Sequence, residues 1–230
     1  MEDLEKLYTS SKIFVVIPVY NESAIIQSVI TEIQLAGYKN IIIIDDGSMD
    51  STYEQVSKND VIVVRHYLNR GKGATLRTGI EVAKMLKADV VVTIDGDGQH
   101  NPNDIKKMLY LIWQGNDVVL GSRLFNSKGM PIFKIIANYF GNLCTWILCG
   151  LWVSDSQSGF RAYSKKAIAM INTRAERYEY DSEIIREIYR NKLKFFEIQI
   201  EVRYTNYSIN KVSKMNIKNG LDALFKMIIY

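Results

Sequence analysis

The chain has 230 residues, enough to bury one large hydrophobic core or two small ones. Its composition, 47% hydrophobic and 23% charged, is ordinary for a globular protein and excludes a disordered chain, a collagen or a coiled coil. Lysine and arginine outnumber aspartate and glutamate by 29 to 25, a mildly basic balance that favours anionic ligands or lipid headgroups over nucleic acid.

The first half alternates short, β-branched apolar runs with stretches of helical periodicity. The expected strands are 13–19, 40–44, 61–65, 89–94 and 117–120, and the expected helices are 22–36, 51–58, 71–86 and 103–114. Near-continuous Val/Ile strands separated by helices indicate a mostly parallel sheet buried on both faces. The sequence therefore predicts a doubly wound α/β fold, in which ligands bind beyond the carboxyl ends of the strands.

The second half is less regular and has no Pro/Gly-rich linker. Its expected elements are a hydrophobic helical stretch 130–150, a polar loop 154–159, a helix 181–190, a strand 194–202, a polar loop 203–214 and a last helix 215–230. We therefore expect a single domain, 1–230, with a C-terminal helical and loop extension.

Three features bear on the cellular location. Residues 1–12 carry three acids and no apolar stretch, unlike a signal peptide, and no run reaches the ~18–20 apolar residues of a spanning helix. Cys144 and Cys149 would point roughly 140° apart on a helix, so no disulfide is expected. Residues 130–153 combine an apolar face with two tryptophans, which suits an interfacial helix, a core helix or a dimer face. We predict a cytoplasmic protein attached peripherally to the cytoplasmic face of a membrane.

Polar clusters follow each predicted strand. In Asp95-Gly-Asp-Gly-Gln99, two carboxylates at i and i+2 need a counter-ion, and Mg²⁺ or Mn²⁺ could supply it, with Gln99 completing the set of ligands. The alternative is an Asp-Gly turn with solvated acids. Asp46, in Asp45-Asp-Gly-Ser48, could bind a base or ribose, or the segment could be a turn with a helix N-cap. His66 is expected to be structural.

Six segments in order resemble family 2 glycosyltransferases. They are Val16-Ile-Pro-Val-Tyr-Asn-Glu22, Ile44-Asp-Asp-Gly-Ser48, Asn69-Arg-Gly-Lys-Gly73, Asp95-Gly-Asp-Gly-Gln-His100, Gly121-Ser-Arg123 and Ser158-Gly-Phe-Arg161. The nearest likeness is to the dolichol-phosphate mannose synthase branch and its bacterial polyprenyl-phosphate relatives, and it extends from about residue 13 to 215.

The resemblance implies a GT-A fold, a nucleotide-sugar donor and a divalent metal, Mg²⁺ or Mn²⁺. Residues 1–125 would be the nucleotide-sugar half, and 126–230 the acceptor half. The implied donor-binding residues are Pro18, Tyr20, Glu22, Ile44, Asp46, Asp95, Gly96, Asp97, Arg123, Arg203 and Lys211, with Lys214 a rival for Lys211; the implied metal ligands are Asp95, Asp97 and Gln99. Arg203 and the lysine would belong to a mobile basic loop.

The expected chemistry is charge stabilisation on a leaving diphosphate by the metal held by Asp97 and by Arg123. A lipid phosphate acceptor needs no general base, whereas a hydroxyl acceptor needs one, for which Asp155, Asp181 and Glu183 are candidates. The acids at 181 and 183 could instead belong to a helix N-terminus. Because Arg123 and Arg161 are expected to face the cleft, we favour an anionic acceptor.

The sequence thus predicts inverting transfer of a hexose from a GDP- or UDP-sugar to a dolichyl or undecaprenyl phosphate. Two alternatives remain open. The same donor chemistry could act on a saccharide or polyol hydroxyl in polysaccharide synthesis. The chain could also be a non-catalytic nucleotide-binding subunit of a membrane assembly, and a homodimer or a membrane partner subunit is compatible with either.

Overall fold

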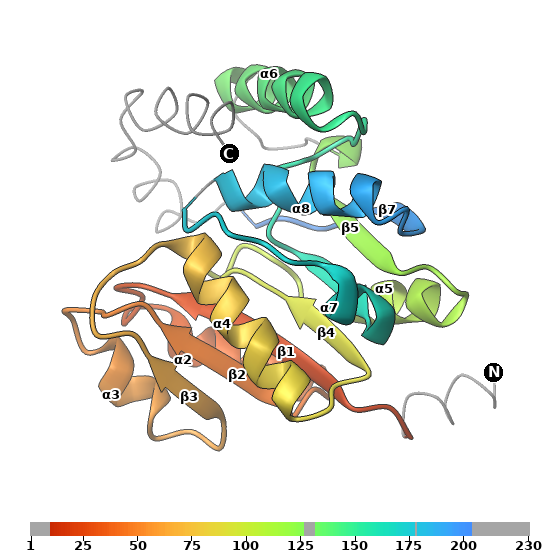
Figure 1. Ribbon diagram of the computed structural model, residues 1–230. Helices are drawn as coiled ribbons and strands as arrows, with labels where there is room; N and C mark the ends of the chain where they lie inside the picture. The colour runs from red at the N-terminus through yellow and green to blue at the C-terminus, as the bar shows by residue number, and fades with distance from the viewer. Residues whose placement is uncertain (1–9, 127–131, 178, 204–230) are drawn as a thin grey trace.

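The computed structural model describes residues 10–126, 132–177 and 179–203, and its centre is one seven-stranded sheet (Figure 1). The strands are β1 Ile13–Val19, β2 Ile41–Asp45, β3 Ile62–Arg65, β4 Val90–Thr93, β5 Val118–Ser122, β6 Arg161–Ser164 and β7 Phe195–Gln199. They lie in the order β3-β2-β1-β4-β6-β5-β7. Only β6 among these strands runs antiparallel to its neighbours, so the predicted mostly parallel sheet is confirmed.

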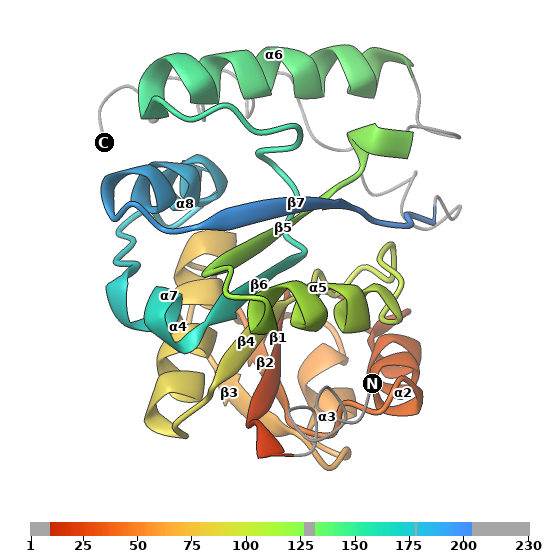
Figure 2. The ribbon, with the colours of Figure 1, turned by 90° about the vertical axis from the view of Figure 1, so that its right-hand side faces the viewer.

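Helices cover both faces of the sheet. They are α2 Ile26–Leu35, α3 Thr52–Val56, α4 Lys72–Met85, α5 Asp104–Trp113, α6 Ile132–Cys149, α7 Lys165–Met170 and α8 Glu179–Arg190. Buried residues of α2, α3 and α5 share one hydrophobic cluster, and those of α4, α7 and α8 share the other. The doubly wound architecture expected from the sequence is therefore confirmed, with the sheet as the middle layer (Figure 2).

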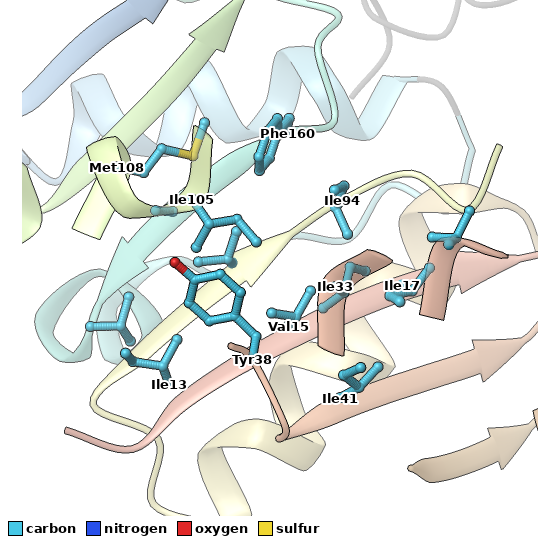
Figure 3. Packing of buried hydrophobic residues seen from close by; sticks show 14 of the residues in the cluster. Ile13, Val15, Ile17, Ile33, Tyr38, Ile41, Ile94, Ile105, Met108 and Phe160 are labelled. Carbon is cyan, nitrogen blue, oxygen red and sulfur yellow. The ribbon is translucent and has the colours of Figure 1, made fainter. Parts of the chain in front are cut away.

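The apolar runs form strands because each strand packs on both faces. In β1, Val15 and Ile17 belong to the cluster under α2 and α5, whereas Phe14 and Val16 belong to the cluster under α4. Figure 3 shows the first of these clusters, where side chains from β1, β2 and α5 meet around Tyr38. A strand with two buried faces needs apolar residues at every position, which explains why the sequence signal was strong here.

Two elements were not predicted from the sequence. The segment 161–164 forms β6, which pairs antiparallel with both β4 and β5, and 165–170 forms the short helix α7. Ser164 begins that helix by accepting a hydrogen bond from the backbone N–H of Ala167. The expected polar loop and last helix beyond residue 203 lie outside the described residues.

Helix α6 forms an outer layer against α8 rather than against the sheet (Figure 2). Its contact side is polar: Thr145 is hydrogen-bonded to the hydroxyl of Ser182 at 3.1 Å, and the thiol of Cys149 donates to the Ser182 carbonyl. Among the described residues, no helix has the length and apolar character needed to cross a membrane.

Candidate active site at the carboxyl ends of the strands

The loops after β1 and β2 are joined by hydrogen bonds. The backbone N–H of Asn21 donates to the Ser48 hydroxyl at 2.9 Å, and that of Glu22 donates to the Thr52 hydroxyl at 2.8 Å. Glu22 is buried, and its carbonyl accepts the first hydrogen bonds of the turn that leads into α2. These hydrogen bonds join the two loops into one frame, which carries the predicted nucleoside-binding residues.

Asp46 anchors the loop that leads into α4. Its carboxylate accepts hydrogen bonds from the backbone N–H groups of Arg70 and Gly71, the latter at 2.7 Å, and contacts Nδ1 of His66 at 2.7 Å. The other ring nitrogen of His66 contacts the Thr78 hydroxyl at 3.0 Å, which agrees with the structural role expected for this histidine. Asp46 thus fixes the backbone immediately before the first residue of α4.

The remaining predicted nucleoside-binding residues differ in exposure. Pro18 and Tyr20 are partly exposed at the end of β1, whereas the side chain of Ile44 is fully buried under α4. Only the backbone of Ile44 could therefore contact a ligand, because its side chain belongs to the core. A hollow of about 520 Å³ lies beside this region and is lined by residues 47–49 and 65–67.

Gly96 allows the loop after β4 to approach β1 closely. A Cβ atom at this position would lie 2.8 Å from a methyl of Val19 and 3.1 Å from the carbonyl oxygen of Pro18. The expected Asp-Gly-Asp segment is consequently pressed against the end of β1, next to the predicted nucleoside-binding positions.

The carboxylates of Asp95 and Asp97 have different partners within the protein. Asp97 accepts hydrogen bonds from both the backbone and the side-chain amide of Gln99, at 3.1 and 2.9 Å. The described residues contain no cluster of three or more His, Cys, Asp or Glu side chains suited to a metal. Two partly exposed carboxylates nevertheless fit Mg²⁺ or Mn²⁺, because such ions take one or two protein carboxylates and complete their shell with substrate phosphates and water.

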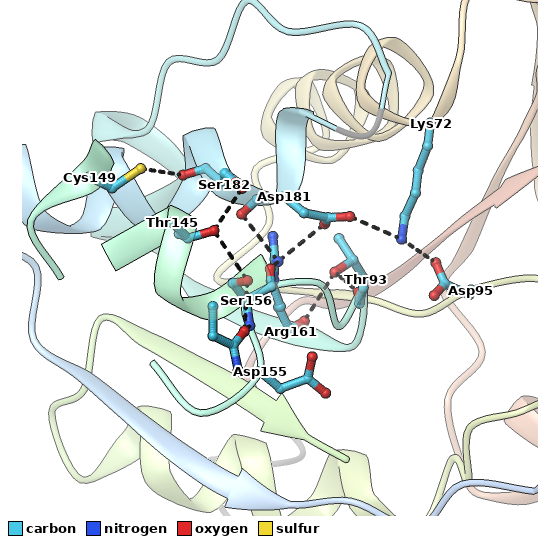
Figure 4. Close-up of polar contacts among 12 residues, drawn as sticks. Lys72, Thr93, Asp95, Thr145, Cys149, Asp155, Ser156, Arg161, Asp181 and Ser182 are labelled. Carbon is cyan, nitrogen blue, oxygen red and sulfur yellow. Dashed lines mark hydrogen bonds and ion pairs between the residues drawn. The ribbon is translucent and has the colours of Figure 1, made fainter. Parts of the chain in front are cut away.

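Lys72, the first residue of α4, lies between two of the predicted site carboxylates (Figure 4). Its Nζ is 3.0 Å from Oδ1 of Asp95 and 3.6 Å from Oδ2 of Asp181. Burial opposes the ammonium charge, yet the attraction of the two carboxylates raises the pKa of Lys72 above its usual value. This lysine belongs to the Asn69–Gly73 motif, but its place in the site was not predicted from the sequence. Its position directly after β3, at the ligand-binding edge, was the available signal.

Arg161 does not face the cleft, which corrects the expectation from the sequence. Its side chain is 2% exposed, donates to the Ser156 carbonyl at 2.7 Å and forms an ion pair with Oδ1 of Asp181 at 3.1 Å. Burial alone would lower the pKa of Arg161, but Asp181 raises it, so the guanidinium stays charged inside the protein. Arg161 is consequently a buried partner of Asp181 and no direct ligand for an acceptor.

Arg123, at the end of β5, forms a bidentate ion pair with Asp155. The two N–H···O distances are 2.7 and 2.8 Å, and the Arg123 backbone N–H donates to the same carboxylate. Burial would raise the pKa of Asp155, but Arg123 outweighs it and lowers that pKa below its usual value. Arg123 remains partly exposed, with 22% of its side chain accessible.

Replacing Arg123 with methionine should reduce the loss of folding stability that occurs at acidic pH. The lowered pKa of Asp155 means that its pairing stabilises the native protein above the unfolded pKa of about 4 and is lost as pH falls through the native pKa. We expect the Arg123→Met variant to be roughly 2 kcal/mol less stable than wild type at pH 7, with the gap narrowing towards pH 3. Urea unfolding across this pH range measures the difference in stability between variant and wild type. A difference that is constant with pH would contradict the pairing of Arg123 with Asp155.

The three candidate bases are all engaged within the protein. Asp155 pairs with Arg123, Asp181 pairs with Arg161 and Lys72, and the Glu183 carboxylate accepts hydrogen bonds from the backbone N–H groups of residues 174 and 175. A carboxylate whose oxygens are held by such partners is poorly placed to take a proton from a substrate hydroxyl. The described geometry therefore gives no support to a general base among these acids.

The predicted basic pair is only partly described. The backbone of Arg203 lies beside the acidic loop, since its N–H donates to the Gln99 carbonyl at 2.8 Å, but its guanidinium pairs with Glu32 on α2 at 2.7 Å. Because both partners are exposed, this pair is weak enough for the side chain to be redirected at small cost. Lys211 and Lys214 lie outside the described residues.

The chain is similar to known glycosyltransferases. Residues 14–172 match the family described as glycosyl transferase family 2. UDP-N-acetylglucosamine–dolichyl-phosphate N-acetylglucosaminyltransferase of Methanococcus voltae is 38% identical, over 94% of this chain and 95% of the relative. Polyprenol monophosphomannose synthase of Mycolicibacterium smegmatis is 24% identical, over 98% of this chain and 89% of the relative.

The fold has a solved counterpart in glucosyl-3-phosphoglycerate synthase from Mycobacterium tuberculosis, crystallised with Mn²⁺, UDP and phosphoglyceric acid. The TM-score is 0.73 at 19% identity, covering 99% of this chain and 82% of that chain. This likeness identifies the sheet and its helices as a GT-A fold. Since the family match spans more than half of the sequence and the 38% identity nearly all of it, the chain belongs to glycosyl transferase family 2 and is a glycosyltransferase.

Proposed function

We propose that this enzyme transfers a hexosyl group from a UDP- or GDP-sugar to a polyprenyl phosphate, with a divalent metal and inversion at the anomeric carbon. The observation that carries the proposal is the 38% identity, across 94% of the chain, to a relative whose name states a UDP-GlcNAc donor and a dolichyl-phosphate acceptor. Relatives at lower identity are named for polyprenol and undecaprenyl-phosphate acceptors as well.

The donor would bind along the carboxyl ends of β1, β2 and β4. In this proposal the frame around Tyr20 and Glu22 receives the nucleoside, and Asp95 and Asp97 face the diphosphate through Mg²⁺ or Mn²⁺. A bound divalent ion would neutralise charge that develops on the leaving diphosphate. Arg123 at the end of β5 and a redirected Arg203 would add positive charge on the same side.

The acceptor is proposed to be a phosphate because the three candidate bases are already engaged by other groups of the protein. A phosphate monoester is largely ionised near pH 7, with a second pKa of about 6, and can attack without giving up a proton in the same step. A sugar or polyol hydroxyl would need proton removal, and Asp155, Asp181 and Glu183 each already accept strong contacts.

A lipid acceptor would be reached from a membrane surface, for which α6 supplies an apolar face. Exposed residues follow one side of this helix at helical spacing: Ile132, Ile136, Tyr139, Phe140, Leu143 and Ile147. Trp146 and Trp152, both about half exposed, stack edge to face with ring centroids 5.9 Å apart. Aromatic rings with a polar edge favour the lipid–water interface, so we propose that α6 lies on the bilayer surface.

Replacing Ile147, 70% exposed on α6, with glutamate should weaken binding to anionic phospholipid vesicles about tenfold, because a buried isoleucine contributes about 1.5–3 kcal/mol. Vesicle co-sedimentation measures the change. The matched control is Leu35→Glu, where an 82% exposed leucine lies on a different helix, α2. Equal loss in both variants, or a change in oligomeric state confined to Ile147→Glu, would contradict the membrane assignment.

The direct test is an assay of the purified protein on vesicles that contain dolichyl or undecaprenyl phosphate. UDP-GlcNAc, UDP-glucose and GDP-mannose are supplied separately, with Mn²⁺, Mg²⁺ or EDTA. The proposal expects one donor to give a lipid-phosphate-linked sugar only with metal, and an anomeric configuration opposite to that of the donor by NMR. Transfer to a soluble hydroxyl acceptor with none to the lipid phosphate would refute it.

A further inference from the structure

Both oxygens of the Asp95 carboxylate are already engaged by groups of the protein. Oδ1 lies 3.0 Å from Nζ of Lys72, and Oδ2 lies 3.5 Å from Nε2 of His100. The ring of His100 is buried against Phe160, with centroids 5.1 Å apart, so it has little freedom to move away. A metal ion that binds Asp95 therefore shares the carboxylate with these groups or displaces one of them, and the lysine contact is the one made by a flexible side chain.

The surrounding backbone keeps Lys72 at this carboxylate. The loop before it is tied to Asp46, as described above, and α4 begins at Lys72 itself. On the other side, a Cβ atom at Gly159 would lie 2.5 Å from Oδ1 of Asp95 and 2.7 Å from Nζ of Lys72. A side chain at position 159 would therefore require the lysine or the aspartate to shift, so the glycine accommodates the pair in its present position.

Lys72 also has a second partner. Asp181 on α8 places Oδ2 at 3.6 Å from the same ammonium, and its other oxygen is held by Arg161 (Figure 4). If Asp95 turns to a metal ion, the ammonium keeps one carboxylate and is not left as an unpaired, largely buried charge. The arrangement can therefore exchange one cation for another at Asp95 without breaking the network behind it.

We propose that Lys72 is the internal counter-ion of Asp95 and competes with the divalent metal for this carboxylate. It is a positioning residue that weakens metal binding by the donor-free enzyme, so that the metal binds tightly only when the donor diphosphate supplies further oxygens. This inference rests on the metal site of the proposed function, and it predicts that metal and nucleotide bind with positive coupling.

The physical reason is the repulsion between the ammonium and a divalent ion that share one carboxylate. Lys72 lies where a cation bound to Oδ1 of Asp95 would be its near neighbour, and side chains only 22% and 26% exposed are poorly screened by solvent. Removing the lysine charge should therefore increase metal affinity, which is the opposite of the effect expected for a lysine that merely supports the fold.

The test is Mn²⁺ binding to the nucleotide-free protein, followed by the electron paramagnetic resonance signal of free Mn²⁺. Lys72→Met should bind Mn²⁺ at least tenfold more tightly than wild type, equivalent to about 1.4 kcal/mol. Lys72→Arg keeps the charge and should stay within threefold of wild type. The matched control is Lys84→Met, which removes the same charge from the exposed side of α4. Circular dichroism establishes that each variant is folded.

Unchanged or weaker Mn²⁺ binding by folded Lys72→Met overturns the inference, as does an equal gain in Lys84→Met. If Lys72→Met does not fold, crystal structures of the wild type with and without Mn²⁺ decide. The distance from Nζ of Lys72 to Oδ1 of Asp95 should then lengthen beyond about 4 Å when Mn²⁺ is bound; an unchanged ion pair beside a bound Mn²⁺ refutes the competition. Failure of every protein, with or without UDP, to bind Mn²⁺ would instead refute the metal requirement of the proposed function.

Discussion

Replacing Asp97 with asparagine should lower kcat/KM of the transfer reaction by about 10³-fold while leaving the fold intact. The substitution keeps the size of the side chain but removes the carboxylate charge that would face the metal–diphosphate unit. Loss of one positioned electrostatic contact to a developing charge typically costs ~10²–10³-fold in rate, and a metal ligand lies at the upper end. Within the described part of the chain, the Asp97 carboxylate accepts its hydrogen bonds from the neighbouring Gln99, so stability should change little.

The measurement is steady-state kinetics with saturating Mn²⁺ and the donor that the vesicle assay selects, together with a thermal melt. Asp60→Asn is the matched control, because Asp60 lies exposed in the turn before β3 and the substitution changes the net charge equally. We expect Asp60→Asn to retain wild-type kinetics. An Asp97→Asn enzyme within tenfold of wild type would mean that the metal is held elsewhere, or that the reaction does not depend on it.

Strands with two buried faces were predictable because their signal is local. Nine of the twelve residues of β1 and β2 are Ile or Val, and each of these nine belongs to one of the two core clusters. Strand β6 was missed for the opposite reason: its four residues, Arg-Ala-Tyr-Ser, carry no β-branched run. It is a strand because β4 and β5 lie on either side of it, and that pairing is set by the tertiary structure.

The location of the candidate site was predictable from the sequence, but the contacts between its side chains were not. A doubly wound sheet brings the loops after β1, β2 and β4 to one edge, so the clusters around Glu22, Asp46 and Asp95 could be grouped in advance. The sequence could not show which charged side chains pair with one another. The pairs of Lys72 with Asp95 and of Arg161 with Asp181 join segments distant in the chain.

Those charge pairs change the chemical interpretation. Arg161 was expected to face the cleft, because the sequence does not show which residue is its partner. In the structure its charge is neutralised by Asp181 inside the protein. The metal set, the nucleoside-binding residues and the division into halves 1–125 and 126–230 stay predictions. The sheet draws strands from both halves, since β4 pairs with β6, so the halves are not separate structural layers.

Replacing Arg161 with methionine should lower the free energy of unfolding by about 3 kcal/mol and the melting temperature by roughly 10 °C. The guanidinium is 2% exposed, and its removal leaves the Asp181 carboxylate, 6% exposed, with only the more distant ammonium of Lys72 as its cation. An uncompensated buried charge is the costly part of such a loss, so the double variant Arg161→Met/Asp181→Leu should recover stability relative to Arg161→Met alone.

The thermodynamic cycle consists of wild type, Arg161→Met, Asp181→Leu and the double variant, each measured by denaturant unfolding. Arg190→Met is measured in the same way. Arg190 is the matched control, because its side chain is 69% exposed and its ion pair with Glu187 is 3.7 Å long, so its loss should cost less than about 0.5 kcal/mol. A strongly destabilised Arg161→Met variant that the second substitution partly rescues would establish that the arginine serves the buried network. If Arg161→Met is instead as stable as wild type but loses activity, the guanidinium turns towards the substrate, and the acceptor site must be sought between β6 and α8.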